Sequence, residues 1–439
     1  MVTRRRVLKG FAASAAISTS AWARSPIRSL LLASAFPVRS VEFSDDDFSD
    51  LEPLGKAIGS ARVVQLGEPS HAAGTAFAAK ARIIKYLHQR KGFDVLIWES
   101  GLYDVSIAQA AMREPATSAV VAAQKGVFTL WSQAAQVKPL FEYIQASQTA
   151  TSPIEMAGFD MQVTADGTRE RFAQDLASFI GKLEVPDLRA EAAVHTDQAI
   201  AARKRLYDGK FAVTADLDAL SAATAMLRGL IAKRRAVFEQ AHGVLQTEFM
   251  DQCLQNMHSD AVLRSEAVTA QTTPERESRR DAWNATILRW LLRRQYAGRK
   301  AVIWAHNVHV MDAYYAPGFR DLHLQQQGGD MTTTGVLLKQ LLGQQVYTVG
   351  LTAYGGEEGY AMGGPKTTVA AAPTDSLEGH LHSLGYPYAF LDLRALGHDE
   401  RLRNLPMRAP KFDLNTIADP AQVYDGIFFI DQMAPASRV

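Results

Sequence analysis

A chain of 439 residues, 47% of them hydrophobic, can bury a large core, and its 47 basic against 46 acidic residues leave a formal net charge of +1. This balance gives no reason to expect nucleic acid or an anionic membrane as a partner, because phosphate binding needs a concentrated basic surface. The single cysteine, Cys253, excludes an intramolecular disulfide and a multi-thiolate zinc site, and we expect it to be a small buried residue.

The first 23 residues are typical of an export signal. The run TRRRVLK at 3–9 resembles the twin-arginine motif, and Ala21-Trp22-Ala23 is a small-x-small cleavage site. The stretch between them is too short and too rich in Ala and Ser to span a bilayer as a helix. We therefore expect the twin-arginine export machinery as a partner, a periplasmic or secreted location and no stable membrane anchor.

From about Arg62 onward, short apolar runs alternate with helical stretches, which is the pattern of an α/β fold with a mostly parallel central sheet flanked by helices. Between the first two strands, FAAKARIIKYLHQRKG has apolar residues at helical spacing and ends at Gly92. The predicted strands are Arg62 to Leu66, Phe93 to Trp98, Ile154 to Gly158, Ala301 to Ala305, Gln345 to Leu351, Tyr388 to Leu391 and Gly426 to Ile430.

The stretch from about 169 to 299 differs from the rest of the chain, because it is rich in Ala, Leu, Arg, Glu and Gln and poor in Gly. Its apolar residues recur at intervals of three and four, which predicts a large helical insertion that packs on the sheet or caps a pocket. With no long low-complexity linker, residues 40–439 form one elaborated domain in this interpretation.

Ionisable side chains follow four of the predicted strands. They are Glu68 and His71 in LGEPSH, Glu99 in LIWES, Asp160 in AGFDM, and His306 and His309 in WAHNVHV. Ligands collect at the carboxyl ends of strands in open α/β sheets, so we expect these groups to meet in one pocket. Burying several ionisable groups together is costly unless they are paired, bound to metal or catalytic.

Two chemistries fit this set of residues. In metal-free hydrolysis, a histidine takes a proton from water, a carboxylate orients the ring, and other imidazoles stabilise the oxyanion. In metal-dependent hydrolysis, the same Glu and His side chains bind a divalent ion that activates water. A serine nucleophile is a third option, since Ser70 precedes His71 and Ser100 follows Glu99, but neither serine lies in a Gly-x-Ser-x-Gly elbow.

Five landmarks in order, LGEPSH, GFDVLIWESG, AGFDMQ, WAHNVHV and DGIFFIDQMAPAS, resemble the erythromycin esterase family over nearly all of the mature chain. The resemblance implies an α/β core with a helical insertion. It also implies hydrolysis of an ester or lactone by water activated on a histidine, without a required metal or other cofactor.

The resemblance also implies roles for individual residues. His71 matches the general base and Glu68 its neighbour in the same loop, while Glu99, His306 and His309 match the remaining catalytic groups.

Lys80 and Asp160 are expected to handle substrate. Lys80 departs from the family pattern, because characterised macrolide esterases have an arginine there, and lysine lacks the planar two-point fork of a guanidinium.

We therefore expect an exported hydrolase that cleaves a carboxylic ester or lactone, with a macrolide as one candidate substrate. Two alternatives stay open at this point. One is a metal-dependent hydrolase with the same Glu and His residues as ligands, and the other is a periplasmic protein that binds a small ligand or a metal without turnover.

Overall fold

The computed structural model describes residues 26–162, 168–208, 214–269, 274–312, 332–408 and 416–439. The expected signal peptide, residues 1–23, lies outside this part of the chain. The fold takes in residues 26–38, upstream of residue 40, where the sequence placed the start of the domain. Among the helices within the described ranges, none is long and apolar enough to cross a membrane.

A central sheet organises the molecule. Its strands are β1 (Ala35–Val38), β2 (Val63–Leu66), β3 (Phe93–Gly101), β4 (Glu155–Asp160), β5 (Lys300–Trp304), β6 (Val346–Glu358), β7 (Thr367–Val369), β8 (Tyr388–Asp392) and β11 (Gly426–Met433). Their order is β1-β8-β11-β6-β2-β5-β3-β4, with β7 paired to β6. Two short strands, β9 (Leu405–Met407) and β10 (Thr416–Ala418), pair separately.

The neighbouring strands from β11 to β4 all run parallel, whereas β1, β7 and β8 pair antiparallel. This confirms the predicted mostly parallel α/β fold, and all seven predicted strands are present in the sheet. The sequence did not predict β1, β7, β9 and β10, which have three or four residues each, and a proline in β1 and in β9 also argued against a strand.

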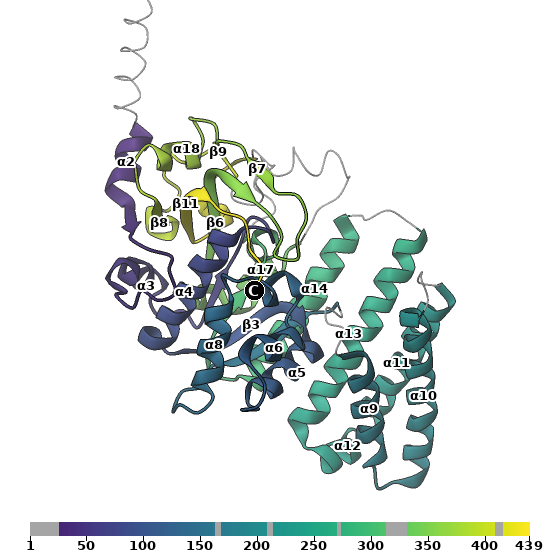
Figure 1. Ribbon diagram of the computed structural model, residues 1–439. Helices are drawn as coiled ribbons and strands as arrows, with labels where there is room; N and C mark the ends of the chain where they lie inside the picture. The colour runs from purple at the N-terminus through teal and green to yellow at the C-terminus, as the bar shows by residue number, and fades with distance from the viewer. Residues whose placement is uncertain (1–25, 163–167, 209–213, 270–273, 313–331, 409–415) are drawn as a thin grey trace, which may run out of the picture.

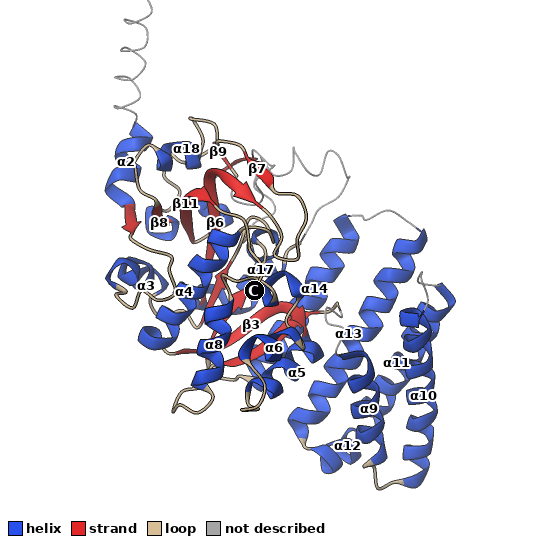
Figure 2. Cartoon of the chain, viewed as in Figure 1, coloured by secondary structure: helices blue, strands red, loops and turns tan. Residues whose placement is uncertain are grey.

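Alternate residues of the central strands pack into different hydrophobic cores on the two sides of the sheet. In β5, Val302 and Trp304 belong to one core and Ala301 and Ile303 to the other. Figure 2 shows the strands enclosed between helices. Since both faces are covered, the strands are continuous apolar runs in the sequence, as is usual for parallel sheets.

Helices from both ends of the chain cover the sheet. The N-terminal ones are α2 (Pro26–Ser34), α3 (Glu52–Ile58), α4 (Gly74–Lys91), α5 (Leu102–Met112), α6 (Ala119–Gln124), α7 (Thr129–Ser132) and α8 (Lys138–Ser147). The C-terminal ones are α15 (Asn307–Val310), α17 (Thr334–Leu342), α18 (Leu377–His382), α19 (Leu393–Leu396) and α20 (Pro420–Val423). Helix α4 ends at Gly92, whose left-handed φ of 73° suits glycine, as the sequence predicted.

The helical insertion lies between β4 and β5. It comprises α9 (Thr168–Gly181), α10 (Pro186–Asp208), α11 (Thr214–Lys233), α12 (Arg235–His242), α13 (Val244–Thr269), α14 (Pro274–Trp290) and a π-helical turn at Leu291–Gln295. Figure 1 shows α9 to α13 as a bundle beside the sheet, with α14 leading back to it. Cys253, on α13, is buried, as expected.

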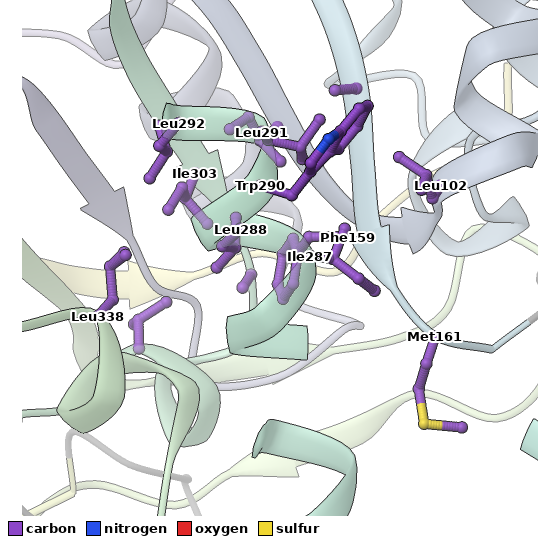
Figure 3. Close-up of a cluster of buried hydrophobic side chains, with 14 of the residues drawn as sticks. Leu102, Phe159, Met161, Ile287, Leu288, Trp290, Leu291, Leu292, Ile303 and Leu338 are labelled. Atoms are coloured by element: carbon purple, nitrogen blue, oxygen red, sulfur yellow. The ribbon is translucent and has the colours of Figure 1, made fainter. Parts of the chain in front are cut away.

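Helix α14 is the part of the insertion that packs most directly on the sheet. Its Ile287 and Leu288, with Leu291 of the π-helical turn that follows, share a hydrophobic core with Phe159 of β4 and Ile303 of β5. Figure 3 shows these side chains together. This packing fixes the position of α14 relative to the ends of β4 and β5.

The rest of the insertion meets the sheet edge less closely. A cleft of about 980 Å³ separates α9, α12 and α13 from α5 and β4. None of the residues that the sequence nominated for the site lines this cleft.

Candidate active site

Four parallel strands bring the predicted residues to one edge of the sheet. Strands β3 and β4 lie on one side of β2, β6 and β11 lie on the other, and β5 is inserted between β2 and β3. This change of direction around β2 is a topological switch point, where open α/β sheets form their ligand crevices. The predicted convergence is therefore present in the structure.

Glu68 and His71 form a hydrogen-bonded pair just after β2. His71 Nδ1 lies 2.9 Å from Glu68 Oε1, which also accepts a 2.9 Å hydrogen bond from Trp131 Nε1 on α7. Glu68 Oε2 accepts from Lys80 Nζ at 2.5 Å. The Glu68 carboxylate is fully buried, whereas 27% of the His71 side chain is exposed. His71 is thus the member of the pair that solvent and substrate can reach.

The partners of Glu68 also determine which nitrogen of His71 carries the proton. Because Glu68 accepts hydrogen bonds from Trp131 and from the Lys80 ammonium, it is an acceptor towards His71 as well. Neutral His71 therefore carries its proton on Nδ1 and leaves Nε2 unprotonated. That is the arrangement of a general base oriented by a carboxylate.

His306 has the opposite arrangement of its ring nitrogens. It is the N-cap of the short helix α15, where its Nδ1 accepts a 3.1 Å hydrogen bond from the Val308 backbone N–H. Neutral His306 must then carry its proton on Nε2 and act there as a donor. Its ring centroid lies 5.0 Å from that of His71, so an acceptor and a donor imidazole are adjacent.

Glu99 is held between cations. Its Oε1 lies 3.3 Å from His309 Nε2 and 3.5 Å from an Arg280 nitrogen, and its Oε2 accepts a 2.8 Å hydrogen bond from the His306 backbone N–H. Burial acts to raise the pKa of Glu99, but His309, His71 and Arg280 together hold it well below the usual range. Glu99 is therefore a permanent negative charge close to His71.

His309 lies between two carboxylates. Its Nδ1 is 2.8 Å from Asp281 Oδ1 on α14, and its Nε2 faces Glu99. Burial acts to lower the pKa of His309, but Asp281 and Glu99 outweigh it and raise the pKa to about 10. His309 is therefore a cation at neutral pH.

Lys80 and Asp160, which the sequence nominated for substrate binding, are both buried. The Lys80 side chain is fully buried, and its ammonium donates to Glu68 and to the Ala305 carbonyl oxygen. Asp160 is also buried and accepts a 2.7 Å hydrogen bond from Arg280. Each of them thus pairs with a charged group of the site, Lys80 with Glu68 and Asp160 with Arg280, and their substrate-binding role stays a prediction.

Three contributors to the site, Trp131, Arg280 and Asp281, were not in the predicted set of site residues. Arg280 and Asp281 are adjacent on α14. The sequence RRDAWNATILRW at 279–290 resembles the helix that precedes the histidine strand in the erythromycin esterase family, and this resemblance was the available signal. Trp131 follows no strand, and nothing in its sequence context marked it. All three lie on helices, whereas the predicted site residues were those that follow strands.

The serine and metal alternatives fit the geometry less well. Ser70 Oγ accepts a hydrogen bond from the Ala72 backbone N–H, and the buried Ser100 Oγ accepts one from the Phe128 backbone N–H. Both hydroxyls therefore bind backbone groups. Both oxygens of Glu68 are already engaged, and cations flank both glutamates. Within the described ranges, no three His, Cys, Asp or Glu side chains are grouped as a metal site.

The family model for erythromycin esterase matches residues 88–433. The chain belongs to the erythromycin esterase family. The match begins after Glu68 and His71, but it includes Glu99, Asp160, His306 and His309. Membership of this family places the protein among the hydrolases.

Two bacterial relatives extend the similarity over most of the chain. "Putative hydrolase YbfO" of Bacillus subtilis is 24% identical over 411 residues, which cover 90% of this chain and 89% of that protein. Erythromycin esterase type II of Escherichia coli is 22% identical, with 90% of this chain and 95% of that protein covered. The solved structure of an erythromycin esterase mutant in its open conformation has a TM-score of 0.67 at 15% identity, covers 92% of this chain and 98% of its own, and shares the fold.

Proposed function

We propose that this hydrolase cleaves a carboxylic ester or a lactone, with His71 as the general base. The observation on which this proposal depends is the Glu68–His71 pair, in which Glu68 accepts a hydrogen bond from the Nδ1–H of His71 and leaves Nε2 free to accept a proton. A macrolide lactone is the first substrate to test, because a relative named erythromycin esterase type II matches 90% of this chain.

The geometry supports a direct attack by water. His71 Nε2 removes a proton from a water molecule, whose oxygen forms a bond to the carbonyl carbon of the ester. Glu68 and Glu99 stabilise the resulting imidazolium, and the Nε2–H of His306 donates to the oxyanion. The bond between the former carbonyl carbon and the alcohol oxygen then breaks, and His71 returns its proton to that oxygen. An ester yields an acid and an alcohol, and a lactone yields one hydroxy acid.

The test is a panel of carboxylic esters and lactones, including a macrolide, with mass spectrometry of the products. Hydrolysis adds the mass of one water. We expect His71→Ala to lower kcat by about two to four powers of ten on any substrate that the wild type cleaves. The matched control is His195→Ala on α10, because the ring of His195 contacts Gln198 on the same helix.

Three results would count against this mechanism. Near-normal turnover by His71→Ala would remove His71 from the role of general base. Activity abolished by chelation and restored by a stoichiometric divalent metal would support the metal-dependent alternative. Saturable binding without turnover of any substrate would support the ligand-binding alternative.

A further inference from the structure

Asp281 links the insertion to the histidine cluster. It lies on α14, next to Arg280, and its Oδ1 lies 2.8 Å from His309 Nδ1. The same oxygen accepts a 2.9 Å hydrogen bond from Thr334 Oγ1 at the start of α17. The Asp281 side chain is almost fully buried, with 1% exposed, so little water is available to weaken its attraction for His309.

His309 has a carboxylate near each ring nitrogen, and the Arg280 guanidinium lies 3.3 Å from its Nε2. His309 is faced by Asp281 and Arg280 from α14 and by Glu99 from β3, while Arg280 also pairs with Asp160 of β4. His306 lies on the same short segment as His309, with ring centroids 6.5 Å apart. Asp281 is the carboxylate on the side of His309 that faces away from Glu99.

We infer that Asp281 is a positioning residue for hydrolysis, which holds His309 as a fixed cation and thereby keeps Glu99 anionic beside His71. This inference rests on the proposed function, because Asp281 acts through the carboxylate that stabilises the His71 imidazolium. Through α14, the insertion thus supplies part of the electrostatics of the site. His309 is then neither a general acid nor a general base, since its proton stays in place during turnover.

A single oxygen of Asp281 makes both of its side-chain contacts in the site. Asp281 Oδ1 has both partners, His309 and Thr334, whereas Oδ2 is buried with no hydrogen-bond partner within the described ranges. An asparagine with its amide oxygen in the Oδ1 position would keep both contacts. Asp281→Asn therefore removes the charge while retaining size and shape.

The first measurement follows His309 by NMR in protein labelled with ¹³C-histidine, with a His309→Asn variant to assign the signal. In the wild type, we expect the His309 resonance to stay at its protonated position from pH 5 to 8, in line with its pKa of about 10. In Asp281→Asn, we expect the resonance to titrate within that range, because one of its two carboxylate neighbours has lost its charge. A wild-type His309 that titrates near pH 6.5 would overturn the inference, even if no substrate has been found.

The second measurement is steady-state kinetics on a substrate that the wild type hydrolyses. We expect Asp281→Asn to lower kcat by about ten- to a hundredfold with little change in KM, because the lost charge acts on the transition state through Glu99. We also expect the alkaline limb of its kcat profile to move to lower pH. Unchanged kcat and an unchanged pH profile would overturn the inference while leaving the proposed function intact.

The matched control is Asp251→Asn on α13. Asp251 pairs with Arg228 at 2.9 Å within the insertion, away from the site residues, so we expect the kinetics and the His309 titration of this variant to be those of the wild type. If Asp281→Asn does not fold, Thr334→Val removes only the hydroxyl donor to Asp281, and His309 should then remain protonated to pH 8. Titration of His309 below pH 8 in Thr334→Val would contradict the assignment of Asp281 as the main source of the charge.

Discussion

Three histidines of the site have different protonation states because their neighbours differ. His71 donates Nδ1–H to a buried carboxylate and keeps a basic Nε2, whereas His306 accepts a backbone N–H at Nδ1 and presents Nε2–H. His309 has a carboxylate at each nitrogen and is cationic. The same residue type thus provides a base, a neutral donor and a fixed charge, and the partner at each ring nitrogen sets the role.

Burial changes the pKa of Lys80, the cation paired with Glu68. Burial lowers the pKa of Lys80 to about 8, even though the ion pair with Glu68 acts in the opposite direction. Its ammonium also lies 4.2 Å from the centre of the Trp304 ring. Lys80 is therefore still protonated at neutral pH, but it loses its proton at a lower pH than an exposed lysine does.

We predict that kcat falls as the pH rises through about 8, because Glu68 then loses the cation that neutralises it. In Lys80→Met this limb should be absent, and kcat should be lower at all pH values. Breaking the buried ion pair should also lower the free energy of unfolding by about 3–5 kcal/mol, measured by urea denaturation.

Lys80→Arg is the control for this prediction, since it keeps the positive charge. We expect it to retain more activity than Lys80→Met. Equal loss in both variants would show that the shape of the lysine, and not its charge, is what Glu68 requires.

At the level of elements, α4 is buried more completely than its sequence suggests. Lys80 and Arg82 are both fully buried, although charged residues on a helix are usually solvated. The sheet covers one side of α4, and the loop at 40–50 covers another. Arg82 donates to the Asp50 carboxylate and to the carbonyl oxygens of Ser40, Asp45 and Asp47 in this loop.

We predict that Arg82→Met lowers the free energy of unfolding by about 3–5 kcal/mol, because the buried Asp50 carboxylate loses the guanidinium with which it forms an ion pair. The measurement is urea denaturation followed by circular dichroism. Arg90→Met, on the exposed end of the same helix, is the control and should change the stability little. A loss below about 1 kcal/mol in Arg82→Met would mean that water replaces the guanidinium in this loop.

In the Ala-His-Asn-x-His segment at 305–309, the asparagine holds the backbone in place and the two histidines belong to the site. Asn307 pairs with the backbone of Leu351 on β6 through both its amide nitrogen and its amide oxygen. Gly67 makes room for it, since a Cβ there would lie 2.0 Å from Asn307 Oδ1. These contacts fix the segment against β2 and β6, and this places His306 and His309 relative to His71.

At the scale of the whole molecule, the insertion contributes unequally to the site. Helix α14 brings Arg280 and Asp281 to the strand ends, whereas α9, α12 and α13 are separated from β4 by the cleft of about 980 Å³. Tyr103 of α5 bridges to Asp175 of α9 with a 2.7 Å hydrogen bond. The insertion therefore contacts the core through α14 and, on the other side of the cleft, through α9 and α13, since Phe172 and Cys253 share a hydrophobic core with Tyr103 of α5.

The twin-arginine run at 3–9 supports the proposal that the whole protein is exported. We predict that replacing both Arg4 and Arg5 with lysine retains the protein in the cytoplasm, because the twin-arginine pair is read by a receptor and not through its charge alone. Cell fractionation followed by immunoblotting measures this. Arg6→Lys, at the variable position of the motif, is the control and should be exported. Export of the double variant would contradict the proposal.

The sequence by itself predicted the seven main strands, because the runs buried on both faces of the sheet are continuous and apolar. It also predicted the convergence of Glu68, His71, Glu99, His306 and His309, since parallel strands place their carboxyl ends at one edge. These features depend on local pattern and on a general rule of topology. They needed no knowledge of which side chains touch.

Only the tertiary structure determined the burial of Lys80, the part played by Arg280 and Asp281, and the protonation of the three histidines. Each of these depends on contacts between segments far apart in the chain, such as Arg280 with Asp160 and His306 with Glu99. Burial removes water from around a charge and makes its energy depend on the nearest partners. Those partners are known only once the chain is folded.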